Sequence, residues 1–336
     1  MFDNKTILVT GGTGSFGKRF TSIILKRYPK LKKLIIFSRD ELKQFHMSQE
    51  IDKKYHHKMR FFLGDVRDKD RLMTSLNGVD YVIHAAALKQ VPTAEYNPFE
   101  FIKTNVLGAQ NLIEACMANK VKKVIALSTD KAAAPLNLYG ATKLCSDKLF
   151  VSANNITGAN KITFSVVRYG NVMMSRGSVI PKFMDKIKEN KIIGITHTEM
   201  TRFNITLEEG VNFVIFTLIK SIGGEIFIPK LSSFKIIDLL KCFQKKVKHK
   251  ITGIRPGEKI HEEMITTSDS HNTIETKKFY IILPAGGKSP STYIKSFSAK
   301  KVKKVFSYNS KDNPNYLSVQ QLKIVINNEN KFLKKN

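Results

Sequence analysis

The 336-residue sequence contains no tryptophan, only three cysteines, and half as many acidic as basic residues. Cys116, Cys145 and Cys242 are too widely spaced to suggest a zinc site or a disulfide framework, so we expect no bound metal and a reducing, cytoplasmic compartment. No apolar run approaches the roughly 18 residues of a membrane span, so we expect no membrane insertion. A strand pattern begins within a few residues of Met1, so we expect no signal peptide.

The excess of basic residues is the most unusual property of the composition. Lysine and arginine number 56 against 28 acidic residues, which gives a formal net charge of +28. They are dispersed, without the clustered basic face and stacking aromatics of a nucleic-acid site, so we expect no nucleic-acid partner. A lysine-rich coding bias explains the charge, with a polyanion site as the alternative. A positive field still attracts a phosphate-bearing substrate.

Short apolar runs alternate with helical patterns through the first 170 residues. The runs are rich in β-branched or aromatic residues, too short for helices, and cover residues 6–10, 33–38, 59–64, 80–87, 122–129 and 162–170. This alternation predicts an α/β fold with a doubly wound parallel sheet of the Rossmann type. We assign residues 1–170 to a dinucleotide-binding domain and residues 171–336 mainly to a smaller, mixed α/β substrate region. A segment near 197–222 is expected to return to the first domain.

A glycine-rich segment follows the first expected strand. Gly11, Gly14 and Gly17 have the spacing GxxGxxG and precede a helix, the context in which backbone N–H groups hold a pyrophosphate. The second strand ends at residues 38–40, Ser-Arg-Asp, with Lys43 one turn later. Basic residues there favour the 2′-phosphate of NADP, although Asp40 leaves NAD as the alternative. We expect Asp65 to contact the adenine and residues 85–87 to lie beneath the ribose.

A second group of chemically active residues follows the fifth expected strand. That strand ends at residues 128–131, Ser-Thr-Asp-Lys, and Tyr139 and Lys143 follow four residues apart on one helix face. A cationic lysine beside a phenol favours the phenolate, so Tyr139 can take a proton from a sugar hydroxyl. With Thr129 nearby, this pattern predicts an oxidation site next to the dinucleotide.

These motifs resemble the extended short-chain dehydrogenase/reductase family, in particular the inverting UDP-N-acetylglucosamine 4,6-dehydratases of pseudaminic-acid biosynthesis. The resemblance runs from about residue 3 to about residue 283 and rests on GGTGSFGK, FSRDELKQ, GDVRD, HAAALKQVP, AEYNP, LSTDKAA, LYGATK, RYGNV, SRGSVIP, MTRF and IRPGEK. Ordinary hexose 4,6-dehydratases have Asp-Glu where this chain has Asp130-Lys131, and a capsule-pathway branch has methionine in place of Tyr139. Retaining relatives carry N-terminal membrane helices.

The resemblance implies a set of site residues. Those for NADP are Gly11, Thr13, Gly14, Ser15, Phe16, Gly17, Ser38, Arg39, Asp40, Glu41, Leu42, Lys43, Asp65, Val66, Ala85, Leu127, Ser128, Tyr139 and Lys143. Those for UDP-N-acetylglucosamine are Lys89, Lys131, Tyr139, Asn171, Val172, Met173, Met174, Ser175, Arg176, Val179, Thr196 and Arg255. The catalytic set is Thr129, Asp130, Lys131, Tyr139 and Lys143. Met173 and Met174 replace expected small residues, and Asn204 replaces an expected aromatic residue.

The resemblance also implies a reaction cycle that returns the cofactor unchanged. Tyr139 removes the C4 hydroxyl proton as hydride moves to NADP, and neutral Lys131 removes the C5 proton. Protonated Asp130 assists departure of the C6 hydroxyl, hydride returns to C6, and C5 is inverted. The product is UDP-2-acetamido-2,6-dideoxy-β-L-arabino-hexos-4-ulose, the first intermediate of pseudaminic acid biosynthesis. We expect burial and nearby Lys143 to leave Lys131 partly deprotonated, with the Asp130 and Lys131 roles open to exchange.

Two kinds of alternative remain at this point. Within the enzyme class, the protein could be a C5-retaining 4,6-dehydratase or an epimerase acting on a UDP-sugar. From another class, it could be a non-catalytic NADP-binding protein, since a fold does not fix a function; the presence of Thr129, Tyr139 and Lys143 argues against this. The resemblance further implies a homo-oligomer, such as a hexamer.

Overall fold

A ten-stranded sheet forms the centre of the computed structural model, which describes residues 2–159, 161–175, 178–243 and 247–335. From β3 to β10 the strands run parallel, and β15, β14 and β16 extend the sheet in antiparallel fashion. In spatial order the strands are β3 (Met59–Leu63), β2 (Lys33–Ser38), β1 (Thr6–Thr10), β4 (Tyr81–His84), β5 (Lys123–Thr129), β6 (Thr163–Tyr169), β10 (Ile226–Pro229), β15 (Phe279–Ile282), β14 (Thr273–Glu275) and β16 (Lys300–Lys301). The order from β3 to β6 is that of a Rossmann fold, so the predicted fold class is confirmed.

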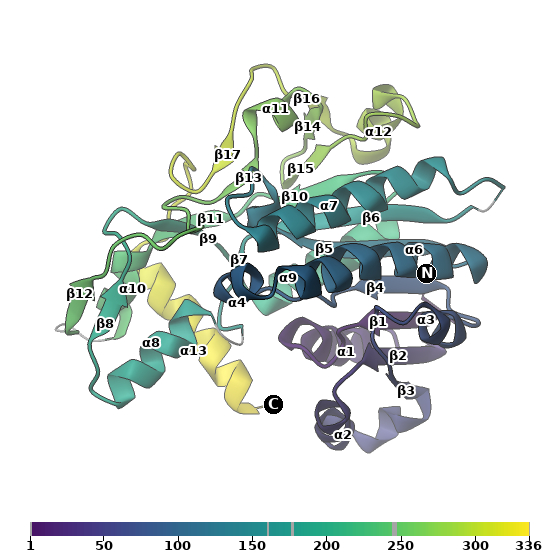
Figure 1. The fold of residues 1–336 in the computed structure, drawn as a ribbon, viewed down its shortest axis with the longest axis horizontal. Coiled ribbons are helices and arrows are strands. Elements are labelled where there is room, and N and C mark those ends of the chain that lie inside the picture. The colour runs from purple at the N-terminus through teal and green to yellow at the C-terminus, as the bar shows by residue number, and fades with distance from the viewer. Residues whose placement is uncertain (1, 160, 176–177, 244–246, 336) are drawn as a thin grey trace.

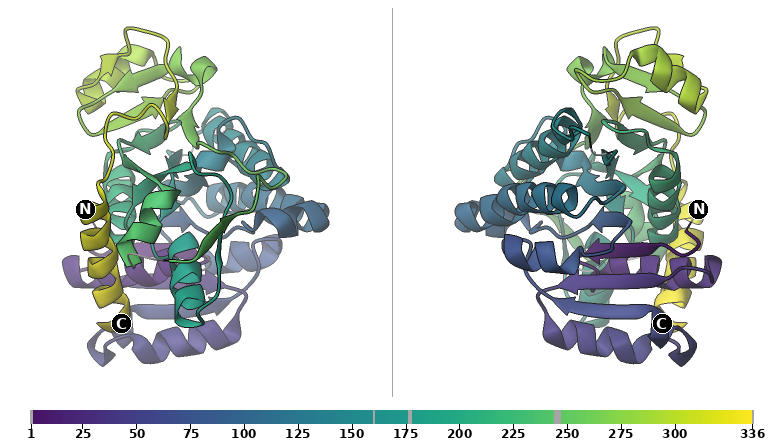
Figure 2. Two further views of the ribbon diagram at one scale, coloured as in Figure 1. Left: turned by 90° about the vertical axis from the view of Figure 1, so that its left-hand side faces the viewer. Right: turned by 90° about the vertical axis from the view of Figure 1, so that its right-hand side faces the viewer.

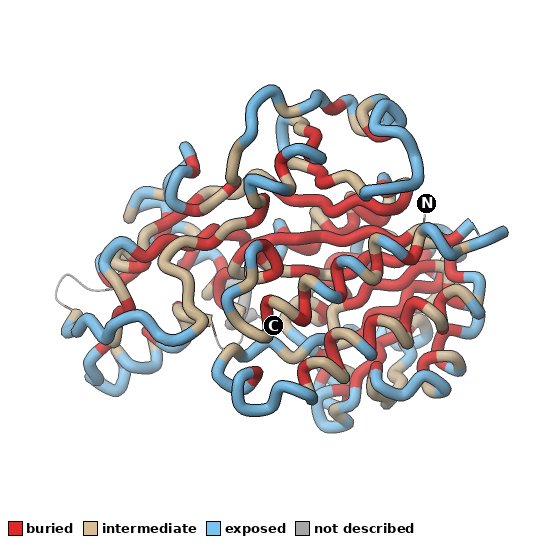
Figure 3. Tube along the Cα trace, turned by 45° about the horizontal axis from the view of Figure 1, so that its top comes forward, coloured by how far each residue is buried: buried red, intermediate tan, exposed pale blue. Residues whose placement is uncertain are grey.

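Helices cover both faces of this sheet (Figures 1 and 2). One face packs on α1 (Ser15–Arg27), α2 (Glu41–Glu50) and α9 (Leu207–Lys220). The other packs on α3 (Lys69–Ser75), α6 (Gly108–Ala118) and α7 (Leu138–Ser152). Each face has its own apolar core, and buried residues follow the strands (Figure 3). Burial on both faces explains why the strands read as continuous apolar runs.

The chain between residues 97 and 119 contains three helical parts. Helix α4 (Val91–Tyr96) precedes α5 (Pro98–Phe101), a π-helical turn (Ile102–Leu107) and then α6. A π-helical turn often occurs at a functional site, because it redirects side chains by one position. Here it points Asn105 at the loop after β4. The Asn105 side chain exchanges hydrogen bonds with the backbone N–H and carbonyl of Leu88, both at 2.9 Å.

A smaller region lies beside the carboxyl end of the central sheet (Figure 1). It contains the three-stranded sheet β11 (Ser232–Lys235), β9 (Thr201–Ile205) and β7 (Asn171–Val172), and the pair β8 (Ile193–Ile195) and β12 (His249–Ile251). Helices α8 (Val179–Lys188), α10 (Ile236–Phe243) and α13 (Val319–Lys335) accompany them. A separate apolar cluster holds this region together. The smaller region provides a second wall, opposite the central sheet, so a substrate can be enclosed between the two.

The remaining elements lie beside the last strands of the central sheet (Figure 1). They are β13 (Glu263–Ile265), which pairs with β17 (Tyr308–Asn309), and the short helices α11 (Thr267–Ser270) and α12 (Pro290–Phe297). Helix α9, from the segment expected to return to the first domain, packs against α1, whereas β9 belongs to the smaller sheet. The division at residue 170 stays a prediction. None of the helices in the described part of the chain combines the length and hydrophobicity that a membrane crossing requires.

Candidate active site

The glycine-rich loop connects β1 to α1 at the carboxyl edge of the sheet. Gly11 has a φ of +63°, and a Cβ there would lie 2.8 Å from the backbone of Ala86. A Cβ on Gly17 would lie 2.1 Å from the carbonyl oxygen of Gly12, so only glycine lets α1 begin this close to the loop. The first turn of α1 therefore presents its backbone N–H groups where a pyrophosphate can approach. Expected cofactor residues in this loop and turn are Gly11, Thr13, Gly14, Ser15, Phe16 and Gly17.

Charged groups gather where β2 and β3 end. The Asp40 carboxylate accepts the Lys43 backbone N–H at 2.9 Å, as the N-cap of α2, and forms an ion pair with the Lys43 ammonium. Arg39 lies 3.6 Å from Asp65, which also pairs with Arg67 at 2.8 Å. Burial of Asp65 is outweighed by its contacts with these arginines, and its pKa lies below the ordinary value. The remaining expected residues at this edge are Ser38, Glu41, Leu42 and Val66.

The loop after β4 lies against the glycine-rich loop. The backbone N–H of Ala85 donates to the Thr10 carbonyl oxygen at 3.2 Å, which fixes the expected ribose floor. Asn105 holds the next part of the loop and also donates to the Thr142 hydroxyl on α7 at 3.0 Å. The loop carrying Lys89 is thereby joined to the helix that carries the expected catalytic tyrosine. Burial lowers the pKa of Lys89.

Tyr139 and Lys143 are both buried on α7. Burial raises the pKa of Tyr139 to about 12, although the charge of Lys131 and a hydrogen bond with Thr129 act in the opposite direction. Burial lowers the pKa of Lys143, against the charge of Asp147. Tyr139 is thus a neutral phenol in the resting enzyme, and the cation that favours its phenolate is Lys131.

A buried ion pair fixes the inner side of α7. Asp147 accepts a hydrogen bond from Ser128 at 2.7 Å and pairs with Arg168 at 3.2 Å. Arg168 also donates to the carbonyl oxygen of Met264, in β13, at 3.0 Å. Arg168 therefore joins the expected catalytic helix to a strand from the C-terminal half. Leu127 precedes Ser128 in β5, so these two expected cofactor residues lie at the carboxyl end of that strand.

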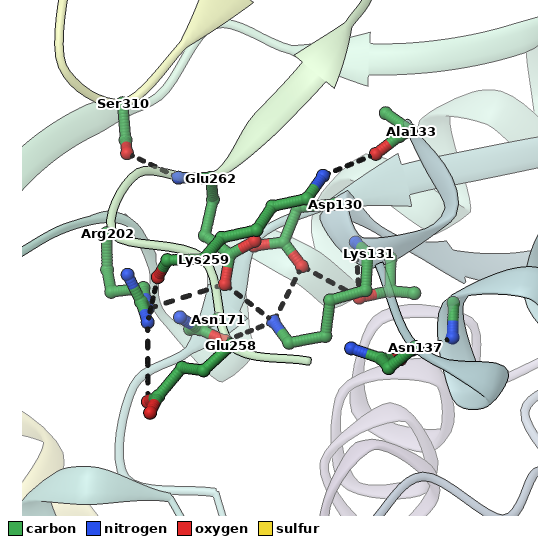
Figure 4. A network of polar contacts seen from close by, with 12 residues as sticks. Asp130, Lys131, Ala133, Asn137, Asn171, Arg202, Glu258, Lys259, Glu262 and Ser310 are labelled. Carbon is green, nitrogen blue, oxygen red and sulfur yellow. Dashed lines mark hydrogen bonds and ion pairs between the residues drawn. The ribbon is translucent and has the colours of Figure 1, made fainter. Parts of the chain in front are cut away.

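Lys131 lies between two buried carboxylates (Figure 4). Its Nζ donates to Asp130 Oδ1 at 3.0 Å and to Glu262 Oε1 at 3.1 Å, with Asn171 Oδ1 at 3.5 Å. Arg202 Nε lies 3.4 Å from the same Glu262 oxygen. The cluster thus contains two cations and two anions. About 24% of the Lys131 side chain remains accessible, so a substrate can reach it.

The charges of this cluster decide its resting protonation state. Burial lowers the pKa of Lys131, but the carboxylates of Asp130 and Glu262 outweigh burial and raise it above the ordinary value. Burial and the Glu262 charge raise the pKa of Asp130, whereas Lys131 and Arg202 overcome burial and lower that of Glu262. Lys131 is therefore an ammonium group in the resting enzyme. The expectation that burial and Lys143 leave Lys131 partly deprotonated is wrong for this state.

A cavity of about 390 Å³ opens in front of Lys131, between the central sheet and the smaller region. The expected substrate residues that line it are Lys131, Asn171, Val172, Met173, Val179, Thr196 and Arg255. Among the described residues, Lys89, Tyr139, Met174 and Ser175 are not part of this lining, and Arg176 lies outside the described residues. The cavity thus brings together the two ends of the expected substrate site, which are Lys131 and, from the IRPGEK motif, Arg255.

The two departures from the family pattern lie in or next to this cavity. Met173 and Met174 are buried in the apolar cluster of the smaller region, and Met174 has a φ of +59°. Asn204 lines the cavity, and its Oδ1 is buried without a hydrogen-bond partner among the described residues. The methionines therefore pack the wall, whereas Asn204 adds an unsatisfied polar atom to it.

Sequence reasoning missed several charged residues of the site. Arg202 and Glu258 occur within MTRF and IRPGEK, which were used only to recognise the family. Arg202 donates to the carbonyl oxygens of Lys259 and Ile260, at 3.0 and 2.9 Å. Glu262 follows the motif by a few residues and offered no signal of its own, because nothing local indicates that it lies beside Lys131.

The glycine-rich loop on a Rossmann sheet and the adjoining tyrosine and lysine define an enzyme fold of the extended short-chain dehydrogenase/reductase type. The chain belongs to the polysaccharide biosynthesis protein family, whose model matches residues 7–284. More distant sugar-nucleotide enzymes, under 25% identical, share the fold, and several were solved with NAD.

Three individual proteins show how close the similarity is. The chain is 54% identical over 338 residues to the UDP-N-acetylglucosamine 4,6-dehydratase (inverting) of Campylobacter jejuni subsp. jejuni serotype O:23/36 (strain 81-176), covering 99% of this chain and 100% of that one. It is 41% identical to a UDP-glucose 4-epimerase of Rickettsia bellii (strain RML369-C), covering 98% and 97%. The X-ray structure of Pen from Bacillus thuringiensis, 38% identical, gives a TM-score of 0.89 over 98% and 99% of the two chains. The resemblance to inverting dehydratases is confirmed.

Proposed function

We propose that this protein is a UDP-N-acetylglucosamine 4,6-dehydratase that inverts C5. The observation that carries the proposal is the 54% identity to a protein of that name over the whole chain, together with a lysine in place of the second acid of ordinary 4,6-dehydratases. The product is UDP-2-acetamido-2,6-dideoxy-β-L-arabino-hexos-4-ulose. NMR of the product formed from UDP-N-acetylglucosamine tests the proposal. A new C6 methyl group and an inverted C5 are expected.

The cofactor proposed for this chain is NADP. A Cβ on Gly11 would clash with the backbone of Ala86, and a Cβ on Gly17 with that of Gly12, so these glycines give the tight turn and close helix packing of a dinucleotide-binding loop. The exposed guanidinium of Arg39 suits a 2′-phosphate, while the Asp40 carboxylate already caps α2 and pairs with Lys43. When bound, the oxidised nicotinamide would supply a hydride acceptor at C4 and, once reduced, a hydride donor at C6. Lys143 is proposed to bond the nicotinamide ribose.

Tyr139 is proposed as the group that accepts the C4 hydroxyl proton. Its phenol must first release a proton to solvent, and the charge of Lys131 and a hydrogen bond with Thr129 favour this release because both lower the pKa of Tyr139. Arg255 is proposed to bind the UDP diphosphate from the far wall of the cavity. Arg176, the other arginine expected to bind the substrate, lies outside the described residues.

Asp130 and Lys131 are proposed to work as one acid–base pair. Transfer of a proton from Lys131 Nζ to Asp130 Oδ1, which are 3.0 Å apart, breaks an N–H bond and forms an O–H bond. The neutral amine then takes the C5 proton, and the carboxylic acid gives its proton to the departing C6 hydroxyl. The pair returns to ammonium and carboxylate, so no net proton is consumed. C5 receives a solvent proton from the opposite face, which balances the proton that the Tyr139 phenol releases to solvent before it accepts the C4 proton.

An epimerase is the second candidate, because a Rickettsia relative 41% identical to this chain carries the name UDP-glucose 4-epimerase. The two activities differ in the atoms of the product. An epimerase leaves the C6 hydroxyl in place and inverts C4, whereas the dehydratase removes that hydroxyl. A product that keeps its C6 oxygen overturns the dehydratase proposal, and a C6-deoxy product with unchanged C5 identifies a retaining enzyme.

The wider setting follows from this chemistry. We propose that residues 1–170 bind NADP, that residues 171–336 mainly bind the UDP-sugar, and that the protein is a cytoplasmic homo-oligomer. The 4-keto product fits the first step of pseudaminic acid biosynthesis. Size-exclusion chromatography with light scattering tests the oligomer.

A further inference from the structure

We propose that Glu262 is a positioning residue that holds Lys131 against Asp130 and sets the proton affinity of that pair. The inference rests on the proposed dehydratase activity. Glu262 is separated from Lys131 by 131 positions in the sequence, yet the two side chains are 3.1 Å apart. The site is therefore completed by a residue from the C-terminal half that no motif assigned.

Both the backbone and the side chain of Glu262 are fixed by specific contacts. Its backbone N–H donates to Ser310 Oγ at 2.9 Å, and its carbonyl oxygen accepts from the Ser310 N–H at 2.7 Å. The side chain is 98% buried and points toward Lys131 and Arg202 (Figure 4), and Glu262 is one of the residues that line the cavity. A buried carboxylate is costly unless it is paired, and here the pairing groups are Lys131 and Arg202.

Arg202 holds the Glu262 carboxylate in place and leaves its contact with Lys131 intact. Its guanidinium donates to the carbonyl oxygens of Thr201, Lys259 and Ile260, so Arg202 is fixed by backbone groups. Lys259, the other nearby cation, donates to the carbonyl oxygen of Ala133 at 2.7 Å. Glu258 lies on the far side of Arg202, at 3.8 Å. Glu262 therefore meets Lys131 as an ionised group in one defined orientation.

This arrangement limits where the Lys131 amine can lie. With Oε1 of Glu262 at 3.1 Å and Oδ1 of Asp130 at 3.0 Å, the ammonium is held from two sides. Thr129 donates to the same Asp130 oxygen at 2.8 Å and fixes the acid partner. Without Glu262, the flexible four-carbon stem of Lys131 has one anchor fewer. A displacement of about 1 Å in a reacting group can cost about 10² in rate.

The negative charge of Glu262 also acts on both members of the pair. It favours the protonated form of Asp130 and of Lys131, and its contribution raises both pKa values. In the active form, Asp130 and Lys131 share one proton. At low pH a second proton binds, so the pair has no free base. At high pH the shared proton is lost, so the pair has no acid. Removing the charge therefore shifts both limbs of the pH–rate profile to lower pH. A residue that only stabilised the fold would not move these limbs.

The test compares Glu262→Gln with the neighbouring variant Glu263→Gln. Gln keeps the size of Glu262 but removes its charge. Glu263 instead accepts a hydrogen bond from Ser307 at 2.6 Å and is not among the residues that line the cavity, so it is a matched control. We expect Glu262→Gln to lose about 10²-fold in dehydration and in uptake of solvent deuterium at C5. Its acid limb moves to lower pH, while transient reduction of the cofactor persists. Glu263→Gln behaves like wild type.

The outcomes separate this inference from the activity on which it rests. If wild-type enzyme does not convert UDP-N-acetylglucosamine to the C5-inverted product, the proposed function is wrong. If wild-type enzyme does, and Glu262→Gln matches its rate and acid limb, the role of Glu262 is overturned. Glu262→Asp keeps the charge but withdraws it by one methylene. Glu262→Asp should dehydrate more slowly than wild type, while the acid limb of its pH–rate profile stays near that of wild type. If Glu262→Asp has wild-type activity, the positioning role is refuted, and this test holds even if Glu262→Gln does not fold.

Discussion

A Cβ atom on Gly140 would lie 2.3 Å from the carbonyl oxygen of Lys131. The absence of a side chain at position 140 is what lets the first turn of α7 pack against the turn that carries Asp130 and Lys131. This packing places Tyr139 beside Asp130 and Lys131, the proposed acid–base pair.

Gly140→Ala should separate these two elements. We expect a loss of about 1–3 kcal/mol in stability from overpacking and a fall of at least about 10-fold in kcat. Gly210→Ala on α9 is the matched control, because its Cβ would meet its nearest atoms at 3.8 Å, an ordinary contact. Thermal unfolding and steady-state kinetics measure both effects. Unchanged kinetics in Gly140→Ala would show that the two elements adjust independently.

Tyr139→Phe should abolish most of the C4 oxidation. The ring still packs, but the group that accepts the hydroxyl proton is lost, so activity should fall by roughly 10² to 10⁴. Calorimetric affinity for UDP-N-acetylglucosamine should change little. A variant that keeps most of its activity means that another group takes the C4 proton.

Arg39→Ala should weaken NADP binding much more than NAD binding. Loss of a charged partner for the 2′-phosphate costs roughly 1.5–3 kcal/mol, which is about 10- to 100-fold in Kd. NAD lacks that phosphate and should be affected little. Titration of the purified, cofactor-free protein with each dinucleotide gives both constants. An equal loss for the two dinucleotides removes Arg39 from this role.

Lys131→Met should stop dehydration but allow transient reduction of the cofactor. In deuterium oxide, substrate recovered from this variant should carry no deuterium at C5, whereas wild-type product should carry it. Near-normal dehydration by Lys131→Met would transfer the role of base to Asp130 or to a water molecule.

The same variant should also be less stable at neutral pH. It leaves the buried carboxylates of Asp130 and Glu262 without their shared cation, which costs about 3–5 kcal/mol. Without that cation the two pKa values rise, so the stability gap between the variant and wild type should narrow as the pH falls. Urea unfolding at several pH values measures the gap, and a gap independent of pH contradicts the pairing.

His84 should make the folded state less stable in acid. Burial lowers its pKa to about 3, and its Nδ1 shares a 2.8 Å hydrogen bond with Thr10. Between about pH 6.5 and pH 3 the unfolded chain binds a proton at this residue that the folded chain does not. Stability should therefore fall as the pH is lowered through this range, by up to about 1.4 kcal/mol per pH unit. His84→Asn should reduce that slope in urea unfolding, and an unchanged slope assigns it to other groups.

The sequence predicted the central sheet well, because the expected strands of the first 170 residues, except the half-exposed edge strand β3, are mostly buried. Strand β1, with all five residues buried, is a clear example. The glycine spacing and the Tyr139–Lys143 pair were also recognisable, since each lies within a few residues of chain. These features depend on local periodicity and turn geometry, which a single sequence records.

The charge environment of Lys131 could not be predicted in the same way. Asp130 is its neighbour in the sequence, but Glu262 contacts Lys131 from the segment before β13, and Arg202 pairs with that carboxylate from β9. A sequence shows that these residues are charged but not which distant charge each one meets. The protonation state of Lys131 was consequently assigned wrongly.

The link between Lys131 and Glu262 has a consequence for the order in which the protein matures. On the ribosome, the dinucleotide-binding strands and α7 are synthesised before the chain reaches position 262, and contacts this far apart form late because their loop-closure entropy is high. The nascent chain thus contains the glycine-rich loop, the Asp130–Lys131 pair and Tyr139 before it contains Glu262. A partly synthesised molecule lacks the carboxylate that contacts Lys131 from its second side, so the proposed acid–base pair reaches its final geometry only after position 262 has been made.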